Sequence, residues 1–171
     1  MKNPLFLYRF IIAFVIFGLV VSGLTAFPLR TELQILSNLL VGAGGDFTPA
    51  NHSGLTYWIL TVREGLEHTY DHYPFIAYGT DWLAFGHIVI AMFFLLPFRE
   101  PVRYAGVLWV GVAACILVVP LAAICGPVRG IPSYWQLIDM SFGLGCVIPL
   151  IIAVRLTRRI ESEGVEGAAK V

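Results

Sequence analysis

Residues Leu55–His87 read LTYWILTVREGLEHTYDHYPFIAYGTDWLAFGH, and the organisation of the whole chain can be worked out from this stretch. On a helix, with 100° between neighbours, its central acidic and histidine side chains share one arc roughly 140° wide: Glu64, Glu67, His68, Asp71 and His72. Apolar residues at steps of three and four fill the opposite side: Leu55, Ile59, Val62, Leu66, Tyr70 and Tyr73. The pattern predicts an amphipathic helix that Pro74 stops, with one apolar face and one carboxylate–imidazole face.

The composition of the chain excludes an ordinary soluble domain. Hydrophobic residues make up 58% of the 171 residues and charged residues only 13%, whereas a soluble domain usually carries about 25% charged residues. The net charge is zero, so no basic excess points to nucleic acid. The cysteines Cys115, Cys125 and Cys146 form no C-x-x-C pair, which argues against a disulfide framework. We therefore expect a membrane protein whose first partner is the lipid bilayer.

The apolar segments predict an all-α membrane protein: a four-transmembrane-helix bundle with an outward amphipathic helical loop between the first and second spans. A helix needs about 20 residues to cross a hydrocarbon core of roughly 30 Å. The expected parts are a single membrane domain at 1–158, with spans at about 5–27, 81–98, 104–125 and 134–154 and a loop at 28–80, and a polar cytoplasmic tail at 159–171. The loop should contain a surface helix at 30–40 and a Gly- and Pro-containing turn at 41–51, and the tail should be disordered.

Positive charges near the span ends predict the orientation of the chain. With four spans, most Lys and Arg residues fall on one side: Lys2, Arg9, Arg99, Arg103, Arg155, Arg158 and Arg159. The other side carries Arg30, Arg63 and Arg129. Both termini are therefore predicted to face the cytoplasm of a bacterial-type inner membrane, with loop 28–80 on the non-cytoplasmic side. A cleaved signal peptide is the alternative for the first segment, but its apolar run is long for one, so we favour a retained span.

Two ionisable residues are predicted to meet inside the bundle. His87 lies six residues into the second span, roughly 9 Å from its outer end, and Asp139 lies at a matching depth in the fourth span. Because an ionisable side chain within a span usually faces the bundle interior and has a partner, we expect His87 and Asp139 to pair. The pair can act as a catalytic proton relay, as a ligand pair, or only as a tether between helices.

A metal site is the second candidate. Glu64, His68 and His72 recur at i, i+4 and i+8, with Asp71 beside them, and neutral imidazole and carboxylate are ligands for Zn or Fe. Further ligands are available from the next helix: Asp81 and His87. The alternative is the solvated face of an interfacial helix, which needs no function to explain it.

The residues match no family motif in full. Four spans with an outward loop are similar in outline to the bacterial quinone-coupled disulfide oxidases, but the outward cysteine pairs of that family are missing. His68-Thr-Tyr-Asp-His72 resembles the H-x-x-x-H box of membrane desaturases, which use about eight cytoplasmic histidines, whereas this chain has four histidines in total. A membrane b-type cytochrome would require deep axial histidine pairs, and only His87 is expected inside a span.

Two functional interpretations follow from these patterns. The first is a membrane enzyme or redox protein with an outward site that a divalent metal would complete. The residues of this site would be Glu64, His68, Asp71, His72, Asp81, His87 and Asp139. The second is a non-catalytic subunit or assembly factor of a larger membrane complex or homo-oligomer, in which the acidic face docks a partner. A small transporter is less favoured because the sequence has no paired broken helices.

Overall fold

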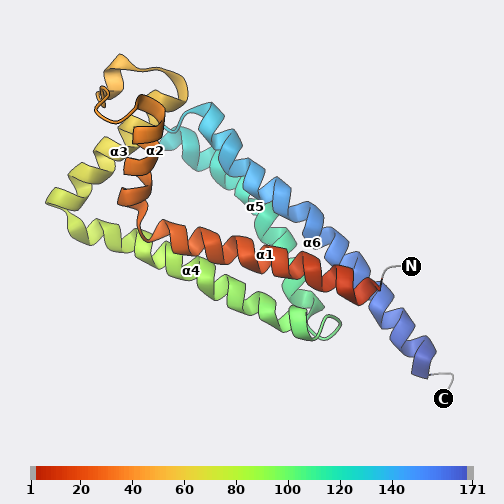
Figure 1. Ribbon diagram of the computed structural model, residues 1–171. Helices are drawn as coiled ribbons and strands as arrows, with labels where there is room; N and C mark the ends of the chain where they lie inside the picture. The colour runs from red at the N-terminus through yellow and green to blue at the C-terminus, as the bar shows by residue number, and fades with distance from the viewer. Residues whose placement is uncertain (1–2, 169–171) are drawn as a thin grey trace. The chain divides into compact units, whose positions relative to one another are not determined.

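The computed structural model describes the backbone of residues 3–168 and the side chains of residues 3–163. This part of the chain is helical throughout apart from short turns and one loop, as the sequence predicted (Figure 1). The elements in order are α1 (Pro4–Ala26), α2 (Leu29–Val41), the 3-10 turn η1 (Pro49–Asn51), α3 (Gly54–His72), α4 (Pro74–Arg99), α5 (Ala105–Val128) and α6 (Ser133–Ala168).

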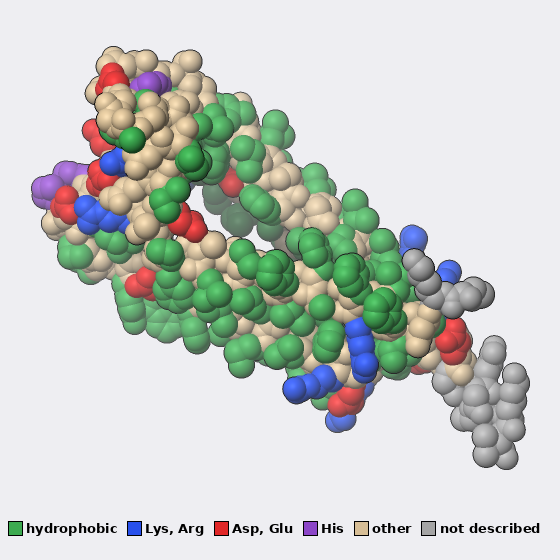
Figure 2. All heavy atoms as spheres, viewed as in Figure 1, with side chains coloured by type: hydrophobic (Ala, Val, Ile, Leu, Met, Phe, Trp, Pro, Cys, Tyr) green, Lys and Arg blue, Asp and Glu red, His purple; other side chains and the backbone are tan. Residues whose placement is uncertain are grey.

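Four of these helices are long and apolar enough to cross a membrane: α1, α4, α5 and the Ser133–Glu163 part of α6. Large apolar side chains such as Phe14 (62% exposed) and Phe142 (69% exposed) lie on their outer surfaces. Figure 2 shows hydrophobic side chains covering much of the length of α1 and α4. Such surfaces suit hydrocarbon and not water, so the prediction of an integral membrane protein with four spans is confirmed in its main feature.

Two helices extend beyond the limits predicted from the sequence. The second span was predicted at about 81–98, and the helix that contains it, α4, begins earlier, at Pro74, because proline fits the first turn of a helix, where no N–H donor is needed. The tail at 159–171 was expected to be disordered, but α6 continues to Ala168. Arg159 and Glu163 stand at i and i+4, a spacing that favours a helix, and positions 169–171 lie outside the described residues.

The structure divides into two compact units, and the first contains α1 up to Gly18 together with the chain from Ile90 onward. Its core contains fully buried side chains from three helices, Tyr8, Leu108 and Leu150. The α5 and α6 helices pack closely along one another. A Cβ atom added at Gly143 of α6 would lie 2.5 Å from the carbonyl oxygen of Cys115 in α5, so this glycine allows the two backbones to approach.

The second unit runs from Leu19 to Val89 and contains the rest of α1, α2, η1, α3 and the beginning of α4. The α2 and α3 helices pack together, and Leu33 of α2 and Ile59 of α3 are both buried. A Cβ atom at Gly23 of α1 would lie 2.9 Å from the carbonyl oxygen of Ala84 in α4, so these two helices also approach closely. The unit therefore joins the ends of two spans to a polar pair of helices.

Candidate functional site on helix α3

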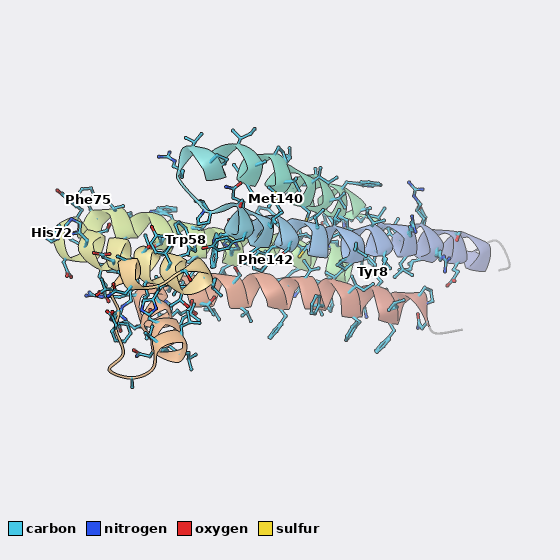
Figure 3. The ribbon with its side chains drawn as sticks, turned by 90° about the horizontal axis from the view of Figure 1, so that it is seen from above. Tyr8, Trp58, His72, Phe75, Met140 and Phe142 are labelled. Atoms are coloured by element: carbon cyan, nitrogen blue, oxygen red, sulfur yellow. The ribbon has the colours of Figure 1, made fainter. Side chains whose placement is uncertain are left out.

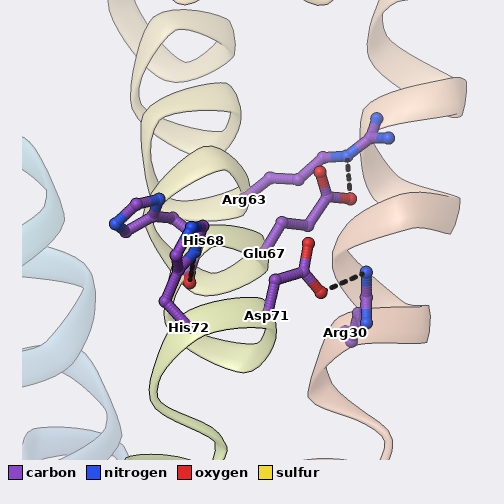
Figure 4. Close-up of polar contacts among 6 residues, drawn as sticks. All are labelled: Arg30, Arg63, Glu67, His68, Asp71 and His72. Atoms are coloured by element: carbon purple, nitrogen blue, oxygen red, sulfur yellow. Dashed lines mark hydrogen bonds and ion pairs between the residues drawn. The ribbon is translucent and has the colours of Figure 1, made fainter.

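The predicted arc of polar side chains on α3 is divided between two directions. Glu67 and Asp71 point toward α2, whereas His68 and His72 point away from it (Figure 4). The 140° width of the arc accounts for this division, because its two edges lie on different sides of a helix that packs against a neighbour along one of them. The carboxylates and the imidazoles therefore have different surroundings.

Two arginines bind the carboxylates that face α2. Arg30 Nη2 of α2 lies 3.4 Å from Asp71 Oδ1, and Arg63 Nε donates to Glu67 Oε1 at 3.0 Å one turn along α3 (Figure 4). The Arg30–Asp71 pair is 42% and 60% exposed, so it contributes about 1 kcal/mol at most. Its main effect is to set the register of α2 against α3.

Aromatic rings complete the surroundings of both arginines. The guanidinium carbon of Arg63 lies 4.6 Å from the centre of the Phe47 ring, and that of Arg30 lies 5.9 Å from the centre of the Tyr70 ring. Both distances fall within the range of cation–π attraction. Because Phe47 belongs to the segment between α2 and α3, the Arg63 contact also holds this connection against α3.

The loop before α3 is organised by Asp46. The side-chain amide of Asn51 donates to its carboxylate at 2.5 Å and the backbone N–H of Thr48 donates at 2.9 Å, and these bonds lower the pKa of Asp46 to about 2. His52 Nε2 donates to the Asp46 backbone carbonyl at 2.7 Å. Ser53 occupies the N-cap position of α3 in an extended conformation, and its side chain makes no capping hydrogen bond.

The imidazoles of His68 and His72 form a stacked pair on the exposed side of α3. Their ring centres are 4.1 Å apart and the rings are inclined by 27°. His72 Nδ1 donates to the His68 carbonyl at 3.0 Å, and both residues are exposed. His72 lies near Phe75, at the junction of α3 and α4 (Figure 3). Glu64 is also exposed on this helix.

The predicted metal site of Glu64, His68, Asp71 and His72 has no support in the described residues, among which no group of three or more ligating side chains can hold an ion. The physical reason is that Asp71 points toward α2 and binds Arg30, away from the imidazole pair. What remains on the exposed side is a pair of histidines with a separate carboxylate.

The predicted partners His87 and Asp139 belong to different units, so their pairing stays a prediction. The half-buried His87 packs against α1 beside Gly23, and its Nδ1 donates to the Leu83 carbonyl at 2.8 Å. Asp139 is half-buried on α6. Within the described residues, its carboxylate has no hydrogen bond or ion pair.

Sequence reasoning missed the roles of Arg30, Phe47 and Asp46. The i, i+4 spacing of Arg63 and Glu67 was a usable signal for the ion pair within α3. The D-F-T sequence at 46–48 was a usable signal for a turn in which an aspartate binds a nearby N–H. Arg30 and Asp71 are 41 residues apart and carry no comparable signal.

Comparison of the chain with protein-family models, with curated proteins and with solved structures found no match.

Proposed function

We propose that this chain is a non-catalytic subunit or assembly factor of a larger membrane complex, and that the α2–α3 pair docks a partner outside the bilayer. The observation that supports this proposal is the engagement of Asp71 and Glu67 by Arg30 and Arg63. The Arg30–Asp71 pair links α2 to α3, and the Arg63–Glu67 pair lies within α3. Both carboxylates thus have arginine partners within the helix pair, which suits a preorganised binding surface.

The orientation is part of the same proposal. The excess of Lys and Arg beside the termini and beside the α4–α5 turn supports cytoplasmic termini in a bacterial-type inner membrane. The α2–α3 pair then lies on the non-cytoplasmic side. There the stacked imidazoles of His68 and His72 are the exposed groups that a partner would meet.

A metal-dependent or redox enzyme is the second candidate, and the stacked His68–His72 pair favours it. Two imidazoles at i and i+4 supply two ligands on one face of a helix, and exposed Glu64 precedes them by one turn. A substrate or partner would have to complete the coordination. This candidate also retains the predicted catalytic roles of His87 and Asp139.

Site-specific photo-crosslinking in intact cells tests the docking proposal. A photoreactive amino acid is placed at His68 or His72, with exposed Phe142 of the α6 span as the matched lipid-facing control. We expect one protein adduct of defined mass from both histidine positions and none from Phe142. Absence of an adduct from both histidine positions would contradict the docking proposal.

Metal analysis of the purified protein distinguishes the two candidates. Zn, Fe, Mn and Cu are quantified per chain in wild-type protein, in His68→Ala and in His52→Ala, a control histidine that belongs to the loop. The docking proposal predicts substoichiometric metal in all three proteins. Stoichiometric metal that is lost in His68→Ala and kept in His52→Ala would establish the enzyme candidate instead.

A further inference from the structure

An open pocket of about 320 Å³ lies beside the first turns of α4 in the second unit. Four aromatic residues and one carboxylate line it: Phe27, Tyr78, Trp82, Phe85 and Asp81. Phe27 follows the end of α1, and the other four residues belong to α4. The pocket is therefore apolar on its walls and has a single negative charge.

The aromatic side chains of α4 form a ladder along one face. Tyr78, Trp82 and Phe85 stand at i, i+4 and i+7, and Asp81 falls within the same arc, roughly 100° wide. The ring centres of Tyr78 and Trp82 are 5.9 Å apart and those of Trp82 and Phe85 are 6.0 Å apart, both nearly perpendicular. Each of the three side chains is more than half exposed, so the ladder presents ring surface to its surroundings.

The depth of Asp81 places this ladder at the edge of the hydrocarbon core. Asp81 lies 18 positions before Arg99 on α4 (99 − 81), which corresponds to roughly 27 Å at 1.5 Å per residue. The hydrocarbon core is about 30 Å thick, and Arg99 favours its polar boundary. Asp81 is therefore expected at the opposite boundary, at the level of the lipid headgroups.

The carboxylate of Asp81 has no hydrogen bond or ion pair within the described residues. The two other carboxylates of this unit closest to it in sequence, Asp71 and Glu67, are both bound by arginine. A carboxylate at a membrane boundary with aromatic neighbours favours a cation, and aromatic faces attract an ammonium group within about 6 Å of the ring centre. A carboxylate repels a headgroup that carries only negative charge.

We propose that this pocket binds the ammonium group of an amine-headed phospholipid, with Asp81 as its counter-ion and Tyr78, Trp82 and Phe85 as its aromatic wall. The acyl chains then extend along the same face of α4 past Phe85, which is 51% exposed. The proposal rests on α4 spanning a bilayer and is independent of what the α2–α3 pair docks.

Native mass spectrometry of the full chain in detergent tests this proposal. The protein is titrated with a phosphatidylethanolamine and with a phosphatidylglycerol of identical acyl chains, and bound lipid is counted per protein. The variants are Asp81→Asn, which removes the charge at constant size, and Asp81→Glu, which restores it. Glu64→Gln is the matched control, because Glu64 is an exposed carboxylate on α3 outside the pocket.

We expect wild-type protein to bind the ethanolamine lipid roughly five- to tenfold more tightly than the glycerol lipid, the range of one cation–π and carboxylate contact. Asp81→Asn should abolish the preference, while Asp81→Glu and Glu64→Gln should keep it. Equal binding of the two lipids by wild-type protein, or an unchanged preference in Asp81→Asn, would overturn the proposal. Full displacement of the lipid by free ethanolamine at equal concentration would also overturn it, because the occupant would then be a small amine and not a lipid.

Discussion

Replacement of Tyr8 by phenylalanine tests how the first unit is held together. Tyr8 is fully buried on α1 (Figure 3). Its hydroxyl donates to the Pro97 carbonyl at 2.9 Å, near the end of α4. In a continuing helix that carbonyl would accept from the N–H of residue 101. Residue 101 is a proline and has no N–H, so Tyr8 supplies the donor that the backbone lacks.

The expected cost of Tyr8→Phe follows from this geometry. An orphaned buried carbonyl costs about 1–3 kcal/mol, whereas hydrogen bonds between membrane helices average only about 0.6 kcal/mol, because the unfolded chain in lipid finds other partners. Pro97 is itself fully buried. Water therefore has poor access to the carbonyl, and we expect a loss of about 1–2 kcal/mol in the free energy of unfolding.

The loss can be measured by reversible unfolding in mixed micelles with increasing SDS, followed by far-ultraviolet circular dichroism. Tyr57→Phe is the control, because the Tyr57 side chain is 43% exposed on α3 and should change the free energy by less than about 0.5 kcal/mol. If the two variants differ by less than about 0.3 kcal/mol, the hydroxyl does not stabilise the end of α4 and the reasoning is refuted.

Two further predictions concern α6 and the loop before α3. Gly143→Ala should lower the free energy of unfolding by about 1–3 kcal/mol in the same assay, because the added Cβ would meet the α5 backbone. Gly145→Ala is the control: its Cβ has open space, so it should stabilise the helix by up to about 1 kcal/mol. Equal effects of the two variants would contradict the close approach of α5 and α6. The hydrogen bonds from Asn51 and Thr48 lower the pKa of Asp46 from 3.8 to about 2. Their stabilisation of the loop is therefore complete above pH 3.8 and is lost as the pH falls through 2. The NMR shift of the Asn51 side-chain amide should therefore titrate near pH 2, and a midpoint near 4 would refute the assignment.

The sequence predicted the four spans because long apolar runs have few alternatives in a chain with so little charge. It also predicted that a helix ends before Pro74, but not that the same proline begins the next helix. Proline both disfavours helix in the residue before it and suits the first helical turn, and only the second effect determines where α4 begins.

The candidate site was less predictable than the fold. Helical spacing predicted that Glu67, His68, Asp71 and His72 share one arc, and α3 is helical over these residues, although the carboxylates and the imidazoles point in two directions. It could not show that Arg30 of α2 would bind Asp71, because that contact depends on the packing of α2 against α3. A helical projection gives the direction in which each side chain leaves its own helix. It contains no information about side chains of a neighbouring helix that can bind the same group.

The length of α6 has a mechanical consequence. The helix runs for 36 residues, roughly 54 Å at 1.5 Å per residue, whereas a hydrocarbon core is about 30 Å thick. A continuous helix transmits a tilt along its axis, so a change of roughly 10° displaces two points about 20 Å apart on that axis by about 3.5 Å relative to each other. A tilt of α6 within lipid therefore moves the part of the helix beyond the hydrocarbon core by several ångströms.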